Sequence, residues 1–203
     1  MGLVNNELFS KEFIEKLKGD FLNAKPYKYV SIVNFLKEEK ADEILDALKK
    51  EKFFEKECDL FSLSQTDDFG SIKKGSLKEF YNYMRSEEFG LWVEQVSGIK
   101  LRIGEIDMAG TLYKACDYLL CHDDKLEGRK IAFVFYLSKN FDEKDGGSFA
   151  MFDSVEGVPG KVIKRYTPKW NSLFMFEVSR NSFHEVEENI SDKNRYAIGG
   201  WFH

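Results

Sequence analysis

The sequence predicts an α+β fold in which a mainly helical N-terminal half precedes a set of short strands. Up to Gly98, apolar residues recur mostly every three or four positions, as on one face of a helix. After Gly98 the period changes to two, which is typical of strands. No repeat divides the 203 residues, so we expect one domain, with residues 1–98 as helical support and 99–203 as the strand-rich core.

Three segments of the N-terminal half have the helical pattern. Residues 10–21 begin at Ser10, a favourable N-cap residue, and residues 40–54 and 76–98 repeat the same apolar spacing. Between the first two helices, residues 27–36 alternate β-branched and aromatic side chains, which predicts a strand. We expect the helices to pack against a sheet as a scaffold, with charge runs such as KEEKADE on their solvated faces.

The C-terminal half contains eight strand-like runs separated by turn-rich segments such as DEKDGG and EGVPG. The runs cover residues 99–109, 112–120, 131–138, 147–153, 160–167, 171–178, 182–188 and 195–203. Short, regularly spaced strands predict a sandwich or a barrel, and eight of them fit a jelly roll. The predicted core is therefore a jelly-roll barrel, also called a double-stranded β-helix.

Composition and charge argue against several classes of function. The net charge is −5 and the charges are interspersed, so nucleic acid is an unfavourable primary partner. The longest apolar run, IAFVFYL, is far shorter than the roughly 20 residues that span a bilayer, and we expect no secretory signal or membrane anchor. Cys58, Cys116 and Cys121 lack CxxC spacing, which favours a reducing compartment, the cytoplasm or nucleus.

Two of the three histidines predict a metal site together with one aspartate. His122 and Asp124 lie two positions apart at the end of a strand-like run, and alternation would place both on one face. His184 lies in the seventh run, which can return beside the second in a barrel. Two imidazoles and one carboxylate form the 2-His-1-carboxylate facial triad of Fe(II) oxygenases. We expect Asp123 to face away and the terminal His203 not to be a ligand.

Arg195 and Tyr136 predict a site for a 2-oxo acid cosubstrate beside that metal. Arg195 lies on the strand after His184, and a guanidinium can bind a carboxylate through two parallel hydrogen bonds. Tyr136 follows the first two ligands by one strand and could donate a phenolic hydrogen bond to the same carboxylate. An isolated His-x-Asp pair is more often a surface or core pair, so the prediction depends on the conjunction. The conjunction describes a site for 2-oxoglutarate.

Several segments also resemble a known family. YLLCHDDKLEGRKIAFVFYL, DGGSFAMF, PKWNSLFMFEV, SFHEVEE and RYAIGGWFH resemble the catalytic domain of the ribosomal prolyl hydroxylases. These are 2-oxoglutarate- and Fe(II)-dependent oxygenases that modify a proline of the small-subunit ribosomal protein at the decoding centre and are linked to translation termination. The similarity extends upstream through FFEKECDLFSLSQTDDF and covers most of the chain.

The resemblance implies an activity and roles for individual residues. Carbon 3 of a prolyl ring would be hydroxylated with dioxygen, while 2-oxoglutarate is oxidatively decarboxylated to succinate and carbon dioxide, with ascorbate as reductant. The implied iron ligands are His122, Asp124 and His184; the implied 2-oxoglutarate contacts are Arg195 and Tyr136; and the implied site lining includes Tyr113 and Trp201.

The chain departs from the family's pattern in two ways. Larger members continue into a second, related barrel without the metal triad, and this barrel is expected to be absent here because the chain stops at His203. Ala197 stands where relatives would have a small hydroxyl residue, two positions after Arg195 and therefore facing the same way. Loss of that hydroxyl should weaken the cosubstrate carboxylate site without abolishing it.

Two alternative functions stay open from the sequence. One is a 2-oxoglutarate oxygenase with another substrate, either a different prolyl protein or a nucleobase, although the acidic balance and the lack of a basic aromatic groove argue against nucleobases. The other is a non-catalytic jelly-roll module that only binds a partner. The retention of all three metal ligands and of Arg195 argues against this second alternative.

Overall fold

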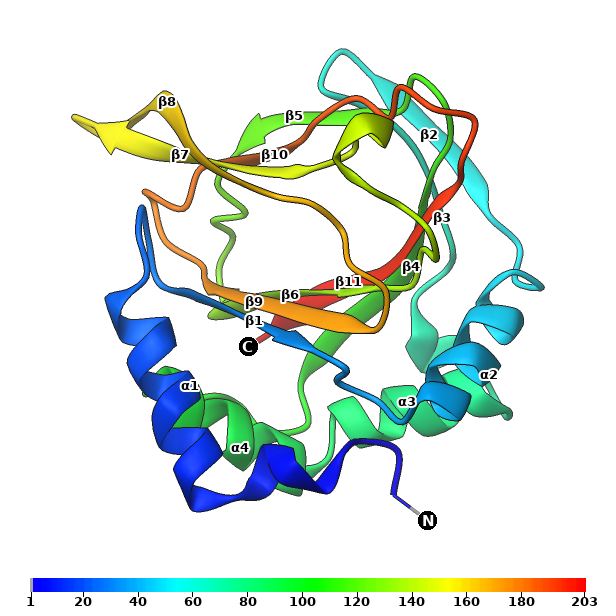
Figure 1. Ribbon diagram of the computed structural model, residues 1–203, viewed down its shortest axis with the longest axis vertical. Helices are drawn as coiled ribbons and strands as arrows, with labels where there is room; N and C mark the ends of the chain where they lie inside the picture. The colour runs from blue at the N-terminus through cyan, green and yellow to red at the C-terminus, as the bar shows by residue number, and fades with distance from the viewer. Residues whose placement is uncertain (1) are drawn as a thin grey trace.

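The computed structural model describes residues 2–203, whose strands form one curled antiparallel sheet with helices on one side (Figure 1). The four α-helices are α1 (Lys11–Asn23), α2 (Glu38–Leu48), α3 (Ser76–Met84) and α4 (Glu87–Ser97). The Ser10 and Ser86 side chains cap α1 and α4 by accepting hydrogen bonds from the amides of Phe13 and Phe89. None of the helices within residues 2–203 is long and apolar enough to cross a bilayer.

The sheet has eleven strands, and its order places strands from both halves of the chain side by side. The strands are β1 (Tyr29–Val33), β2 (Phe54–Cys58), β3 (Phe61–Gln65), β4 (Ile106–Tyr113), β5 (Tyr118–His122), β6 (Ile131–Tyr136), β7 (Phe149–Val155), β8 (Val158–Tyr166), β9 (Ser172–Glu177), β10 (His184–Val186) and β11 (Arg195–Phe202). Their order is β1-β9-β6-β11-β4-β3-β5-β10-β7-β8, and β2 pairs only with β3. This order confirms the predicted jelly-roll barrel.

Two layers of the curled sheet face each other. In Figure 1, β1, β9, β6, β11 and β4 form the layer next to the helices, and β5, β10, β7 and β8 form the opposite layer. Strand β3 joins the two layers because it pairs with β4 at Ser64 and Gln65 and with β5 at Phe61 and Ser62. The space between the layers is where a site can form.

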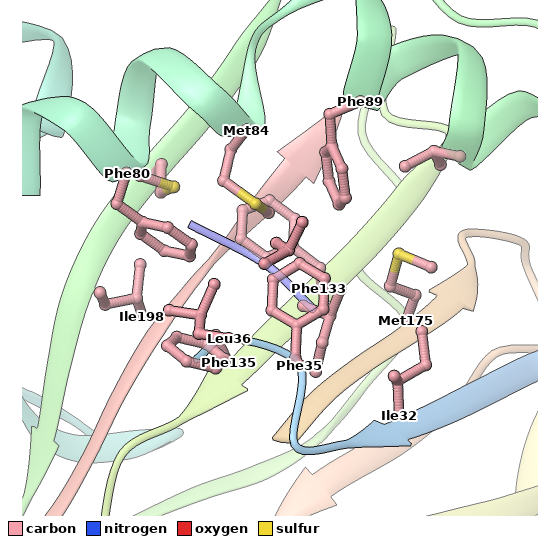
Figure 2. Packing of buried hydrophobic residues seen from close by; sticks show 14 of the residues in the cluster. Ile32, Phe35, Leu36, Phe80, Met84, Phe89, Phe133, Phe135, Met175 and Ile198 are labelled. Carbon is pink, nitrogen blue, oxygen red and sulfur yellow. The ribbon is translucent and has the colours of Figure 1, made fainter. Parts of the chain in front are cut away.

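The main hydrophobic core lies between the helices and the layer that they cover. Figure 2 shows Phe80, Met84 and Phe89 of α3 and α4 reaching toward Phe133 and Phe135 of β6. The alternate residues of β6, including Ala132 and Tyr136, face the interior of the barrel. Strand β6 is therefore buried on both faces, which explains why its sequence is a continuous apolar run rather than an alternating one.

Several predicted element boundaries in the N-terminal half were wrong. The helix predicted over 40–54 ends at Leu48, because Phe54 already begins β2. The helix predicted over 76–98 is divided into α3 and α4 at Arg85, where Ser86 starts a new helix as its N-cap. The β2–β3 hairpin was not predicted, since all five residues of β2 are exposed and carry no apolar alternation.

Each of the eight strand-like runs of the C-terminal half overlaps a strand, and the first two had the largest boundary errors. The first prediction began at Ile99, whereas β4 begins at Ile106. The second run, 112–120, is divided between the end of β4 and the start of β5, with a turn around Cys116 at positive φ. A residue at positive φ interrupts extended backbone, and the sequence pattern does not reveal it.

Phe135→Ala should lower the free energy of unfolding by about 3–5 kcal/mol, because deletion of a fully buried ring leaves a cavity. The Phe135 ring contacts those of Phe35 and Phe80, with centroids 5.8 and 5.3 Å away. Urea denaturation followed by circular dichroism measures the change. Phe54→Ala, at a ring exposed on β2, is the matched control and should change the free energy by about 0.5 kcal/mol or less. Equal losses in the two variants would contradict this packing.

Candidate active site

Two neighbouring strands bring His122 and His184 together inside the barrel. Strands β5 and β10 are antiparallel, with His184 directly opposite His122, and the ring centroids are 4.2 Å apart. The next pair is Val186 with Leu119, so β5 has two residues where β10 has only Glu185. This is a β-bulge, which re-aims the following side chain. It lets Leu119 and His122, three positions apart, face the same cavity.

Asp124 reaches the two histidines through a turn rather than through strand alternation. Strand β5 ends at His122, and Asp124 has a φ of 59°, in the left-handed region. Its Oδ1 lies 3.5 Å from Nε2 of His122, and its Oδ2 lies 3.4 Å from Nε2 of His184. The predicted grouping of the three side chains is therefore present, although the reason given for it, alternation along a strand, was wrong.

The hydrogen bonds of the two histidines leave the same nitrogen free on each ring. Nδ1 of His122 lies 2.8 Å from the carbonyl oxygen of Leu120, and Nδ1 of His184 lies 2.8 Å from that of Ser182. A carbonyl oxygen can only accept, so each Nδ1 carries a proton and each neutral ring has its lone pair on Nε2. The two Nε2 atoms and the carboxylate are within 4.8 Å of one another, which is a spacing that can hold one metal ion.

The charge state of the three groups suits a divalent cation. Burial raises the pKa of the Asp124 carboxyl, but the adjacent imidazoles of His122 and His184 outweigh this effect and hold the pKa well below its ordinary range. Burial is also the largest influence on His184 and lowers its pKa, so its imidazole is neutral near pH 7. The pKa of His122 is raised, because Asp124 outweighs the opposing effect of burial. The site thus presents a carboxylate and a neutral imidazole to a cation.

A cavity of about 650 Å³ connects the three groups with the other predicted residues, and its size lies in the usual range for small-molecule sites. Its walls include His122, Asp124, His184, Arg195, Tyr113 and Trp201. Tyr136 is fully buried and is not on the cavity wall, but the Cζ of Arg195 lies 5.2 Å from the centre of its ring. The structure therefore brings six of the seven predicted site residues to one cavity and places Tyr136 next to Arg195.

Arg195 and its neighbouring phenols form a buried group of hydrogen-bond donors. Arg195 is 2% exposed, and its Cζ lies 4.9 Å from the centre of the Tyr113 ring. Neither Nε of Arg195 nor the hydroxyl of Tyr136 has a hydrogen-bond partner among residues 2–203. Burial raises the pKa of Tyr113 to about 12 against the opposing effect of Arg195, so the phenol keeps its proton near pH 7. Unpartnered buried donors around a positive charge fit an anionic ligand such as a carboxylate.

Gly147→Ala should disturb this group of donors. Gly147 has a φ of 60°, and an added Cβ would lie 2.9 Å from Cδ of Arg195. The left-handed backbone costs a non-glycine residue about 1–2 kcal/mol, and the contact would push the guanidinium out of place. We expect a comparable fall in the free energy of unfolding together with weaker 2-oxoglutarate binding, measured by urea denaturation and calorimetric titration. Gly157→Ala, at φ 81° with open space around it, controls for the backbone effect alone; equal cosubstrate affinities in the two variants would contradict the prediction.

The remaining sequence expectations concern residues around the site. Ala197 is fully buried, and Thr111 lies directly opposite it on β4 and lines the cavity. The carboxylate of Asp123 accepts from the amide of Lys125 and is outside the metal-binding group, as expected. His203 is also outside it, because its Nε2 pairs with the carboxylate of Asp107 at 3.1 Å.

Sequence reasoning missed two parts of the site. The β2–β3 hairpin forms one wall of the cavity through Lys56, Phe61, Leu63 and Gln65. Arg129, in the charged turn after Asp124, lies with its Cζ 3.4 Å from the centre of the Trp201 ring. Basic residues in a turn usually indicate a solvated loop, so the pattern gave no signal for Arg129; only its position five residues after a predicted ligand could have drawn attention to it.

Comparison with known proteins identifies this arrangement. Residues 108–203 match the family described as "2OG-Fe(II) oxygenase superfamily", and this stretch carries all of the predicted site residues. Residues 108–203 are thus similar to the oxygenase domains of this superfamily. Fe(II) and 2-oxoglutarate are accordingly its metal and cosubstrate, and the donor sets described above fit both.

The chain is similar in sequence to curated prolyl hydroxylases. The chain is 39% identical to mouse "Prolyl 3-hydroxylase OGFOD1" over 90% of its own length and 34% of the mouse protein. It is 32% identical to "Prolyl 3,4-dihydroxylase OGFOD1" of Ostreococcus tauri over 95% of its length and 41% of that protein. The predicted resemblance to prolyl hydroxylases is thereby confirmed, and the chain spans between a third and about two fifths of the length of these relatives.

Solved structures share the fold of the oxygenase domain. A prolyl-4-hydroxylase from Pseudomonas putida matches with a TM-score of 0.73 at 17% identity, covering 92% of this chain and 98% of that one. A prolyl hydroxylase from Trichoplax adhaerens, solved with a peptide fragment, matches with a TM-score of 0.70 at 18% identity, covering 97% and 94% of the two chains. At these identities the comparison supports the fold alone.

Proposed function

We propose that this chain is a 2-oxoglutarate- and Fe(II)-dependent prolyl hydroxylase in which His122, Asp124 and His184 bind the iron. The observation that carries the proposal is the shared cavity: the three metal donors lie within 4.8 Å of one another, and Arg195 lines the same walls. A metal triad alone fits many oxygenases. A triad together with a buried guanidinium whose Nε has no partner among residues 2–203 fits an oxygenase that uses a dicarboxylate cosubstrate.

The residues of the chain would bind and orient the reactants. Arg195 pairs with the far carboxylate of 2-oxoglutarate, and the phenol of Tyr136 lies beside it as a second donor. Tyr113 and Trp201 would line the space between this carboxylate and the prolyl ring. Because Arg195 and Tyr136 are almost completely buried, they hold the cosubstrate away from water, which strengthens each hydrogen bond. When bound, the iron supplies the oxidation of 2-oxoglutarate and of the substrate C–H bond by dioxygen.

The proposed substrate is a proline of a small-subunit ribosomal protein, hydroxylated at carbon 3, with ascorbate keeping the metal reduced. Support comes from the relatives named prolyl 3-hydroxylase and from the motifs that resemble the ribosomal hydroxylases. The same resemblance supports a role in translation accuracy or termination, and the cysteines without CxxC spacing favour the cytoplasm or nucleus. The alternative is a 2-oxoglutarate-dependent prolyl hydroxylase whose substrate is a different protein.

The experiment is mass spectrometry of a peptide from the decoding-centre ribosomal protein, incubated with the enzyme, Fe(II), 2-oxoglutarate and ascorbate. We expect a gain of the mass of one oxygen atom on the proline, and no gain in a matched peptide with alanine at that position. A gain of two oxygens would indicate dihydroxylation, as in the name of the Ostreococcus tauri relative. An unmodified peptide alongside turnover of 2-oxoglutarate with another prolyl protein would contradict the ribosomal substrate but not the oxygenase.

A further inference from the structure

Arg129 connects the metal-binding carboxylate to the wall of the cavity. Its Nη1 lies 3.7 Å from Oδ1 of Asp124 and 3.5 Å from the backbone oxygen of the same residue, to which it donates a hydrogen bond. Its guanidinium carbon lies 3.4 Å from the centre of the Trp201 ring, within stacking distance. The Arg129 side chain is mostly buried, with 17% of its surface exposed. One side chain therefore touches both the metal carboxylate and an aromatic wall of the cavity.

A turn and Arg129 together hold the backbone at Asp124. Its φ of 59° lies in the left-handed region, and strand β5 has already ended at His122. The carbonyl oxygen of Asp124 accepts a hydrogen bond from the amide of Leu126 at 2.8 Å, which closes the turn. Arg129 donates the one side-chain hydrogen bond to this oxygen within residues 2–203, and it also lies 3.7 Å from the carboxylate. Arg129 thus adds a side-chain restraint on Asp124 to the backbone restraint of the turn.

The indole of Trp201 is independent evidence that the cavity wall beside Arg129 contacts a ligand. Its Nε1 is buried and has no hydrogen-bond partner among residues 2–203, although the residue lines the cavity. A buried indole N–H normally finds an acceptor. Because the guanidinium of Arg129 lies against the ring, it fixes the direction in which this N–H points.

We propose that Arg129 is a positioning residue that fixes the Asp124 carboxylate toward the metal and the Trp201 indole toward the bound reactants. The inference rests on the proposed metal site and adds a residue to which neither the sequence pattern nor the predicted triad assigned a role. Arginine suits the task because its planar fork can reach a carboxylate, a carbonyl oxygen and an aromatic face at once. Lysine keeps the charge but lacks that fork.

The charge of Arg129 and its geometry predict opposite effects on metal affinity. A positive charge beside a cation site opposes metal binding, so removal of the charge alone would tighten it. Loss of the restraint on Asp124 would instead weaken metal binding, because outer partners of metal ligands commonly contribute to affinity. Arg129→Lys keeps the charge and removes the planar contacts, so it isolates the geometric effect. Arg129→Met removes both.

The test is titration of the metal-free protein with Mn(II), followed by electron paramagnetic resonance, for wild type, Arg129→Lys, Arg129→Met and a control. Arg165→Lys is the control, because this substitution makes the same chemical change away from the cavity. Arg165 lies on the exposed strand β8 and forms an ion pair with Glu187. We expect Arg129→Lys to bind Mn(II) about tenfold more weakly than wild type and to change the shape of the bound-metal spectrum. Arg165→Lys should match wild type in both.

The possible outcomes test the positioning role of Arg129 separately from the metal site itself. Arg129→Lys with wild-type affinity and spectrum, or Arg129→Met with tighter binding, would overturn the positioning role and leave Arg129 as a charge only. Wild type that does not bind Mn(II) would overturn the metal site itself, which is a separate failure. Urea denaturation of the metal-free variants identifies a loss of folding, and the conservative Arg129→Lys variant decides the question if Arg129→Met does not fold.

Discussion

Asp124→Ala should remove metal binding while the chain still folds. Asp124 supplies the one carboxylate of the group and holds a negative charge at neutral pH, because its pKa is well below the ordinary range. Even outer partners of metal ligands contribute about 10- to 100-fold to affinity, so loss of the charged ligand itself should cost more than roughly 100-fold. Titration with Mn(II), or with Fe(II) under anaerobic conditions, measures the change.

Asp123→Ala is the matched control for this variant. It removes a carboxylate from the adjacent position, whose oxygen accepts from the amide of Lys125 and lies outside the metal-binding group. We expect Asp123→Ala to bind one metal ion per chain as wild type does. Retention of wild-type affinity in both Asp124→Ala and His122→Ala would show that the metal is held elsewhere and that the triad is wrong.

Arg195→Met should separate cosubstrate binding from metal binding. A buried guanidinium that binds a carboxylate through charged hydrogen bonds contributes about 3 kcal/mol or more, which is roughly a hundredfold in affinity for 2-oxoglutarate. Mn(II) affinity should stay as in wild type, because Arg195 does not touch any of the three metal donors. Calorimetric titration of the Mn(II)-loaded protein with 2-oxoglutarate measures the difference.

The stability of Arg195→Met gives a second readout. In the ligand-free chain the Nε of Arg195 is buried without a partner, and a buried charge of this kind is costly. A methionine of similar length should therefore leave the free energy of unfolding unchanged or raise it. Arg165→Met, at an exposed ion pair on β8, is the control and should keep wild-type affinity for 2-oxoglutarate. Unchanged cosubstrate affinity in Arg195→Met would refute its role.

The sequence predicted which residues form the site better than how the chain brings them together. His122, Asp124, His184 and Arg195 were predicted because the chain has few histidines, because these residues lie on or just after strand-like runs, and because the motifs around them resemble a known family. The bulge in β5 and the left-handed backbone at Asp124 actually aim the ligands. Neither has a sequence period, since a bulge adds one residue and a positive φ changes one torsion. Local backbone geometry of this kind becomes visible only in the structure.

The parts of the site that were missed lack apolar periodicity. The β2 strand is exposed at all five positions and three of its five residues are charged, so it has no apolar alternation that would indicate a strand. Arg129 lies among charged residues in a turn, and its contact with Trp201 joins positions 72 residues apart in sequence. By contrast, β6 and β9 were predicted with nearly correct boundaries, because burial on both faces requires long runs of apolar side chains.

Visible absorption of the anaerobic protein with Fe(II) and 2-oxoglutarate tests most directly whether the triad and Arg195 form one site. A 2-oxo acid that chelates Fe(II) gives a charge-transfer band only when both are bound at one site. We expect a band that saturates at one equivalent of each per wild-type chain, that is absent in Asp124→Ala, and that needs far more 2-oxoglutarate in Arg195→Met. Absence of the band in folded wild type, or an unchanged band in Asp124→Ala, would contradict a shared iron and 2-oxoglutarate site at these residues.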